Sequence, residues 1–215
     1  MIYQDEWKSS SRHDASWPLP PLKGSLECLM EFPESEWAAL VPHPLTHSDA
    51  TSGVDAHAHV AESGTGFFRY VLRADLSRVR VPRPQTAERA HDLWSHTCFE
   101  AFIKAPGAPG YYELNFAPSR QWAVYRFDAY RQGLSSPSLD ALPEISVRGF
   151  ADRLEVDAAV RLHDLIGLQG APRLRVGLSA VVEEENGTLS YWALKHVQGK
   201  ADFHCPDGFV LELEM

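Results

Sequence analysis

"LWSHTCFEAFIKAPGAPGYYELNFAPSRQWAVYRFDAYRQG", residues 93–133, contains three short segments in which side chains alternate between two faces, with turn-forming residues between them. The segments are 98–105, 111–117 and 121–128. Period-two alternation bounded by Gly, Pro and Asp predicts β-strands, and the short connections predict that neighbouring strands are antiparallel. The stretch also holds two Trp, four Phe and four Tyr side chains, with Glu100, Glu113, Asn115 and Arg126 among them.

Alternation assigns the side chains of these strands to two faces of a sheet. The face expected in the core carries Phe99, Ala101 and Ile103, then Tyr112, Leu114 and Phe116. The opposite face carries Cys98, Glu100, Phe102 and Lys104, then Tyr111, Glu113 and Asn115. On the third strand, Tyr125 and Phe127 oppose Trp122, Val124 and Arg126. A sheet of this kind has a second face that mixes carboxylates, an amide and aromatic rings.

The rest of the chain shows the same strand signal. Seven further segments are expected as strands: 56–63, 66–75, 145–151, 153–161, 173–184, 189–196 and 208–214. Helical turns are expected only over 163–168 and 84–94. About ten short strands without helix alternation predict an all-β fold, a two-sheet antiparallel β-sandwich with few short helices.

The N-terminal region differs in composition from the rest of the chain. Residues 1–41 are rich in Ser and Pro and are interpreted as a partly irregular extension, with the sandwich domain over 42–215. Residues 34–41 are consistent with one short helix capped by Ser35, or with an edge strand that braces the domain.

Length, charge and cysteine content narrow the class of protein. A chain of 215 residues suits one sizeable domain. The net charge of −9, without basic clusters, argues against nucleic-acid and anionic-membrane partners. Cys28, Cys98 and Cys205 show no paired spacing, so reduced thiols are expected. The absence of an apolar leader or spanning segment predicts a cytoplasmic protein.

The polar and aromatic face suits sugar recognition. A sugar presents C–H patches beside hydroxyl groups, so its site needs a flat aromatic ring close to fixed polar groups. Trp94, Trp122 and Trp192 are candidate rings. The ligand-binding residues that we predict are Trp94, Glu100, Glu113, Asn115, Trp122, Arg126 and His196. Two alternatives stay open: the aromatic rings belong to the core with Arg126 paired to a glutamate, or Glu100 and Glu113 act as the acid and base of glycoside hydrolysis.

Histidines provide a weaker signal for a metal or haem. His57 and His59 lie on one face of a predicted strand, and His196, His204 and Cys205 are close in sequence. Imidazole and thiolate groups are metal ligands, but neither group has a recognisable four-ligand spacing. No catalytic metal is therefore predicted.

The phrases "CFEAFI", "YYELNFAPS" and "WAVYRFDAYRQG", with the closing "DFH" and "FVLEL", resemble the bacterial DOMON-like proteins related to family 9 carbohydrate-binding modules. The resemblance covers about residues 42–215. It implies a sandwich of two antiparallel sheets whose pocket takes sugars or haem, and it does not imply catalysis.

Haem-binding relatives hold iron between Met and His, whereas Met1, Met30 and Met215 are the only methionines of this chain and none lies in a predicted core strand. The resemblance therefore favours a non-catalytic protein that binds a small carbohydrate-like ligand without a cofactor. Haem or metal binding through histidines is the second hypothesis, and an interaction scaffold is the third.

Overall fold

The computed structural model describes residues 37–215, and this part of the chain is an antiparallel, almost entirely β structure. Its strands are β1 (Ala38–Pro42), β2 (Thr51–Val60), β3 (Thr65–Ala74), β4 (Cys98–Lys104), β5 (Tyr111–Phe116), β6 (Trp122–Phe127), β7 (Glu144–Gly149), β8 (Arg153–Arg161), β9 (Arg173–Glu183), β10 (Leu189–Ala193) and β11 (Leu211–Glu214). The helical elements are short 3₁₀ turns: η2 (Leu93–Ser95), η3 (Leu162–Asp164) and η4 (Pro206–Gly208).

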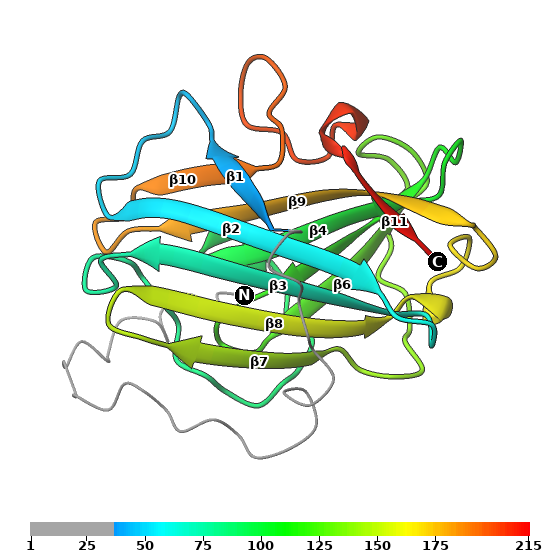
Figure 1. Ribbon diagram of the computed structural model, residues 1–215, viewed down its shortest axis with the longest axis horizontal. Helices are drawn as coiled ribbons and strands as arrows, with labels where there is room; N and C mark the ends of the chain where they lie inside the picture. The colour runs from blue at the N-terminus through cyan, green and yellow to red at the C-terminus, as the bar shows by residue number, and fades with distance from the viewer. Residues whose placement is uncertain (1–36) are drawn as a thin grey trace, which may run out of the picture.

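The strands form one curled sheet with the order β6-β5-β4-β9-β10-β1-β2-β3-β8-β7. Strand β11 pairs with the first part of β9, and β10 pairs with its last part. Figure 1 shows β2, β3, β8 and β7 in front of β9, β4 and β6. We call the front set the first half of the sheet and the set β6, β5, β4, β9 and β10 the second half. Strand β1 joins them, because Leu40 pairs with Val54 of β2 and Val41 pairs with Ala193 of β10.

The main core fills the space between the two halves. The Tyr70 ring of β3 lies 5.1 Å from the Phe99 ring of β4, and Phe68 lies 5.6 Å from Phe116 of β5. The Tyr70 hydroxyl donates a hydrogen bond of 2.7 Å to the Glu100 carbonyl oxygen. The predicted core face of β4 and β5 is confirmed, since its six side chains are all buried in this cluster.

The all-β, antiparallel architecture is confirmed, and all ten predicted strands are present, β8 with the predicted ends and the others with shifted ends. The hydrogen-bonded ladder, however, continues through β1 instead of forming two separate sheets.

Three helical predictions are corrected. Residues 38–41 form a strand, which is the alternative considered for them, because pairing with β2 and β10 satisfies backbone groups on both sides. Residues 34–36, with Ser35, and the rest of the predicted extension lie outside the described part. The turns expected over 163–168 and 84–94 are reduced to η3 and η2.

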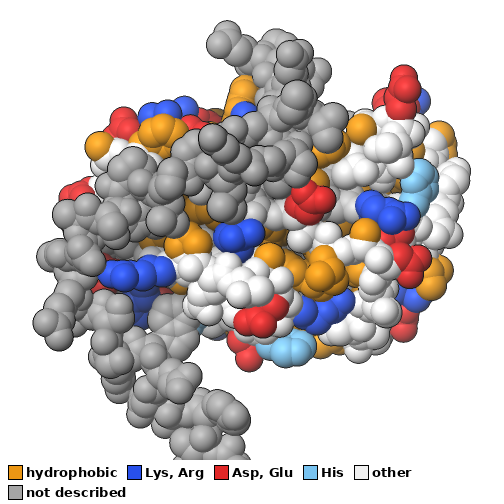
Figure 2. All heavy atoms as spheres, turned by 90° about the horizontal axis from the view of Figure 1, so that it is seen from below, with side chains coloured by type: hydrophobic (Ala, Val, Ile, Leu, Met, Phe, Trp, Pro, Cys, Tyr) orange, Lys and Arg blue, Asp and Glu red, His pale blue; other side chains and the backbone are white. Residues whose placement is uncertain are grey.

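The outer face of the first half is covered with paired charges. Arg148 contacts both Asp157 and Glu155 at 3.0 Å, and Arg153 lies 2.8 Å from Glu155. Figure 2 shows acidic and basic side chains interspersed on the face it presents. Cross-strand pairs of this kind stabilise a sheet without creating a single-sign patch.

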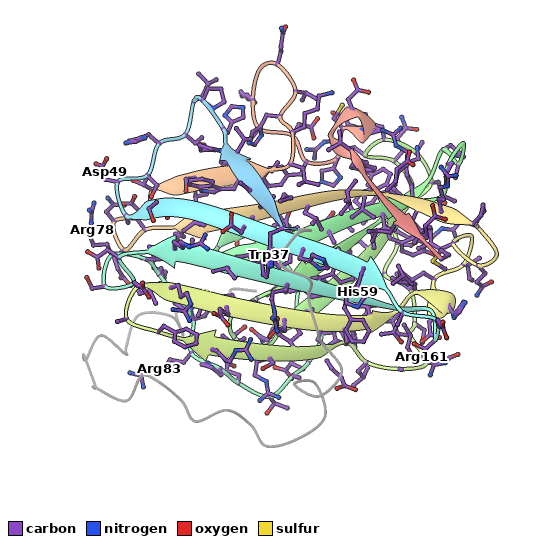
Figure 3. All side chains as sticks on the ribbon, in the orientation of Figure 1. Trp37, Asp49, His59, Arg78, Arg83 and Arg161 are labelled. Atoms are coloured by element: carbon purple, nitrogen blue, oxygen red, sulfur yellow. The ribbon has the colours of Figure 1, made fainter. Side chains whose placement is uncertain are left out.

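Two of the histidines that suggested a metal site, His57 and His59, lie on this same outer face. The His57 and His59 rings are 5.6 Å apart, Trp37 lies 6.0 Å from His57, and Figure 3 shows Trp37 and His59 over β2. Within residues 37–215, no three His, Cys, Asp or Glu side chains are grouped to hold a metal ion. Cys98 and Cys205 are free thiols. No helix in this range could cross a membrane.

Candidate functional site

The outer face of the second half forms the floor of a pocket. On β4, β5 and β6, alternate side chains point away from the main core. These side chains are Glu100 and Phe102 from β4, Tyr111 and Glu113 from β5, and Tyr125 and Phe127 from β6. The register places Phe102 directly opposite Glu113 and Glu100 opposite Asn115. The two glutamates are therefore diagonal neighbours on adjacent strands.

Loops from four parts of the chain raise walls around this floor and enclose a cavity of about 800 Å³. The volume suits a small molecule, because ligand pockets commonly measure about 300–1,000 Å³. The lining residues are His43, Leu45, Thr46, His91, Asp92, Trp94, Glu100, Phe102, Glu113, Tyr125, Phe127, Arg131, Leu134, Val181, Tyr191, Lys200, Ala201, Phe203 and His204.

Glu100 is the most deeply placed acid of the floor. Its side chain is only 2% exposed, and the Ser179 hydroxyl, on the neighbouring strand β9, reaches its Oε2 at 3.5 Å. Burial raises the pKa of Glu100 well above its usual range, and the nearby Glu113 carboxylate raises it further. A carboxyl group in this setting holds its proton and can donate a hydrogen bond.

Glu113 is held by a chain of polar groups. Asn115 donates a hydrogen bond of 2.8 Å to Glu113 Oε1, and His204 Nε2 faces Oε2 at 3.7 Å. The Tyr111 hydroxyl accepts the backbone N–H of Arg131 at 3.2 Å and lies 2.9 Å from His204 Nδ1. The direction of the bond between the Tyr111 hydroxyl and Nδ1 depends on the tautomer of the imidazole, whose second nitrogen, Nε2, faces Glu113.

Burial is the main cause of the pKa shifts of His204 and Glu113. Burial and, to a smaller extent, the Arg131 charge lower the pKa of His204 to about 4, although the Asp202 charge opposes the shift, so the imidazole is neutral at pH 7. Burial also raises the pKa of Glu113, although the Asn115 hydrogen bond and the Arg131 charge oppose the shift. The floor therefore combines one deeply buried acid with one acid oriented by an amide and a neutral imidazole.

The loop that follows β10 closes one side of the pocket and is fastened by Asp202. This carboxylate accepts hydrogen bonds from the Tyr130 hydroxyl at 2.6 Å and from Arg131 Nη2 at 2.8 Å. It also accepts the backbone N–H of His204 at 3.1 Å. Because Arg131 and His204 both line the cavity, Asp202 sets the position of two walls at once.

Asp202→Ala is expected to loosen this loop. Loss of three hydrogen bonds to a charged group should raise the hydrogen-exchange rate of the amides of residues 200–204 by at least about tenfold. Exchange followed by mass spectrometry measures the change, with Asp207→Ala, an exposed acid of the same loop, as the matched control. Equal protection in both variants would show that Asp202 does not fasten the loop.

Aromatic side chains of the floor and of the neighbouring loop pack as a second cluster, separate from the main core. Phe102, Tyr111, Phe127 and Phe209 are buried together, with Tyr125 and Phe203 packed against them. The Tyr111 and Phe127 rings are stacked at 4.8 Å. Gly177 of β9 is required beneath Phe209, since a Cβ atom there would lie 2.9 Å from the Phe209 ring. The aromatic side of the pocket is therefore rigid.

Comparisons with known proteins identify the fold. Among solved structures, that of a candidate carbohydrate-binding protein from Bacteroides uniformis aligns with a TM-score of 0.58 at 16% identity, covering 83% of this chain and 85% of that one. This protein shares that fold. No protein-family model and no curated protein sequence matches the chain.

Two structures of a family 9 carbohydrate-binding module from Caldicellulosiruptor kristjanssonii are also similar, each at 12% identity. The complex with glucose has a TM-score of 0.49 and covers 86% of this chain and 87% of that one. The complex with cellotriose has a TM-score of 0.46, with coverages of 83% and 81%.

The structure brings three of the predicted site residues to the pocket. Glu100 and Glu113 form its floor, and Trp94, which is 52% exposed, stands in its wall. Asn115 lies on the same face of β5 as Glu113 but is fully buried, and it acts on the pocket through its hydrogen bond to Glu113.

The other three predicted residues do not line the pocket. Trp122 is 2% exposed and belongs to the main core, because it pairs with Phe116 and shares its face. Arg126 lies on that same side of β6, near the sheet edge, 3.5 Å from Asp128. His196 Nε2 donates to the Val41 carbonyl oxygen at 2.8 Å, and its ring lies 4.8 Å from that of His43, which does line the pocket. The candidate ring Trp192 is likewise buried in the core.

Several pocket residues were missed from the sequence. Tyr125 and Phe127 follow from alternation, which placed them opposite Trp122, once the core face of β6 is known. His204 and Phe203 lie in the polar, aromatic loop before β11, a type of loop that often carries function. Arg131 and His91 carried no recognisable pattern, since they reach the pocket only through the folding of the loops.

Proposed function

We propose that this protein binds a small carbohydrate or a closely related polyhydroxy ligand in the pocket on the outer face of β4, β5, β6, β9 and β10. The observation that carries the proposal is a cavity of about 800 Å³ that combines two buried carboxyl groups with aromatic walls. A largely apolar cavity with a few convergent polar groups is the usual form of a small-molecule site.

The aromatic residues supply the apolar part of recognition. Trp94 presents half of its surface, and Tyr125 and Tyr191 line the same cavity. A sugar ring has C–H patches on its faces that pack on such aromatic surfaces, while its hydroxyl groups point outward toward hydrogen-bonding partners. The ligand is thereby oriented with its polar edge toward the floor.

The polar groups of the floor supply donors and acceptors in fixed positions. Glu100 in its protonated form donates, and Glu113 accepts at the oxygen atoms that Asn115 and His204 leave accessible. Preorganised groups of this kind bind without a large entropy cost on association. Hydroxyl groups, which both donate and accept, match this pair.

We further infer that the chain is a DOMON-like β-sandwich related to family 9 carbohydrate-binding modules, and that it binds its ligand without catalysing a reaction. The sequence phrases of β4 to β6 support the family relation. The Bacteroides structure of the same fold is described as a candidate carbohydrate-binding protein. Incubation with bound oligosaccharides should release no new reducing ends; their appearance would instead favour the acid–base role of Glu100 and Glu113.

Trp94→Ala is expected to weaken sugar binding by about tenfold, because loss of an aromatic face costs about 1.4 kcal/mol of binding free energy. Isothermal titration calorimetry against the mono- or oligosaccharide that most raises the melting temperature of the wild-type protein gives the two dissociation constants.

Phe150→Ala is the matched control, since Phe150 is a partly exposed ring under Arg153 on the first half of the sheet. Its sugar affinity should equal that of the wild-type protein. If no mono- or oligosaccharide binds the cooperatively folded protein, the proposed function is wrong.

A further inference from the structure

The floor of the pocket holds two acids for which residues 37–215 supply no charged partner in contact. Within residues 37–215, Glu100 forms no ion pair, and its side-chain hydrogen bond is the long one of 3.5 Å from Ser179. Buried carboxyl groups normally have a cationic or strongly hydrogen-bonding partner. The accessible side of Glu100 faces the cavity.

The cationic groups near Glu113 do not fill this role. His204, 3.7 Å from Glu113 Oε2, is neutral at pH 7 because its pKa is about 4. Arg131 is committed to Asp202 at 2.8 Å. The remaining ionisable side chains that line the cavity are His43, His91, Asp92, Tyr125, Tyr191 and Lys200. Beneath the floor, Cys98 lies against Asn115 at 3.8 Å, and burial holds the pKa of its thiol well above the usual range.

The aromatic rings of the pocket are a second feature that favours a cationic ligand. Phe102, Phe127 and Phe203 line the same cavity as the two acids. The faces of aromatic rings attract ammonium groups, and the attraction increases where the ring and the cation are shielded from water. Carboxyl groups combined with aromatic faces suit an amine better than a plain hydroxyl group.

We propose that the ligand carries a protonated amine, as in an amino sugar or another compact polyhydroxy amine, and that this amine pairs with Glu100 and Glu113. The inference rests on the proposed function, because it names the class of ligand for the same pocket. It extends that function by assigning the two floor acids to a charged group instead of to hydroxyl groups.

Binding of such a ligand displaces a proton. Burial and the neighbouring Glu113 raise the pKa of Glu100, which favours its protonated form before a ligand binds. When an ammonium group arrives, Glu100 becomes the carboxylate that pairs with it, and its proton passes to the solvent. The amine keeps its own protons, so one proton is released to the buffer for each Glu100 that ionises.

Calorimetry on matched pairs of sugars tests the inference. The probes are D-glucosamine with D-glucose, D-galactosamine with D-galactose, and D-mannosamine with D-mannose, titrated at pH 7 into the full chain. Each titration is run in phosphate and in MOPS, whose different ionisation enthalpies reveal proton release. One of the amino sugars is expected to bind at least about tenfold more tightly than its hydroxyl partner, with protons released.

Glu100→Gln tests the residue assignment. The variant keeps the shape of the side chain but cannot become a carboxylate, so the affinity ratio between the amino sugar and its hydroxyl partner should fall at least about threefold, with the remaining preference due to Glu113, and the proton release should disappear. Glu144→Gln, an exposed acid at the start of β7, is the matched control and should keep the wild-type ratio. Circular dichroism and a urea titration verify that both variants fold.

The outcomes separate the two proposals. Equal or tighter binding of the hydroxyl sugars without proton release overturns the amine assignment and leaves the carbohydrate proposal standing. A preference for the amine that keeps its wild-type size in Glu100→Gln, with protons still released, overturns the role of Glu100. No binding of any sugar, with or without an amine, to the folded wild-type protein overturns both proposals.

Discussion

Trp122→Ala is expected to lower the free energy of unfolding by about 3–5 kcal/mol, the usual cost of removing a large aromatic side chain from a packed core. Trp122 is 2% exposed, and its neighbours in the core include Phe116 and Val124. The Arg89 guanidinium group lies 4.6 Å from the centre of its ring, so the substitution also removes a cation–π contact. Urea unfolding followed by fluorescence gives the change from the shift in midpoint at constant slope.

The natural comparison is Trp94→Ala. Trp94 is 52% exposed, so its removal should change the free energy of unfolding by less than about 0.5 kcal/mol while weakening ligand binding. Trp122→Ala is thus expected to lower stability, whereas Trp94→Ala is expected to weaken ligand binding. A Trp122→Ala protein that unfolds at the wild-type urea concentration but fails to bind would place Trp122 in the site and contradict the assignment to the core.

Acid is expected to destabilise the protein through His204. Burial lowers the folded-state pKa of this imidazole from 6.5 to about 4, so the unfolded chain binds a proton more readily than the folded protein does. The stability that results is complete above pH 6.5 and is lost as the pH falls through 4. The full shift corresponds to about 3 kcal/mol.

The measurement compares urea unfolding of the wild-type protein and His204→Asn between pH 7 and pH 4. Glu100 and Glu113 act with the opposite sign, since their raised folded-state pKa values make the protein less stable as the pH rises above 4.5. The difference between the two proteins therefore isolates the contribution of His204. His47→Asn, which changes an exposed imidazole, should follow the wild-type curve. Parallel curves for the wild-type protein and His204→Asn would contradict the shifted pKa.

The strands could be predicted because side-chain alternation is local. Ten strands were expected and are present, and the faces of β4 and β5 were assigned correctly, since neighbouring side chains of a strand must point to opposite sides. The strand β1 was less certain, because residues 34–41 have no alternating pattern and only Leu40 of β1 is buried. Its conformation is set by the two strands that it joins.

Part of the pocket floor could be predicted from the sequence for the same reason. Glu100 and Glu113 share a face with Phe102 and Tyr111, and that relation follows from the parity of the residue numbers within each strand. The loop residues His204 and Arg131 were not predicted as site residues, because the sequence carries no information on how far a loop folds back over a sheet.

The sequence by itself determined the all-β class, the antiparallel hairpins and the two carboxyl groups on a face opposite the core, because these features follow from local alternation. The tertiary structure alone decided the place of Trp122. Both faces of β6 carry aromatic rings, so alternation separates Trp122 from Tyr125 without showing which of them is inside. Pairing with Phe116, and packing of the second half of the sheet against the first, buries Trp122 and leaves Tyr125 in the pocket. Long-range packing, which no local pattern encodes, made that choice.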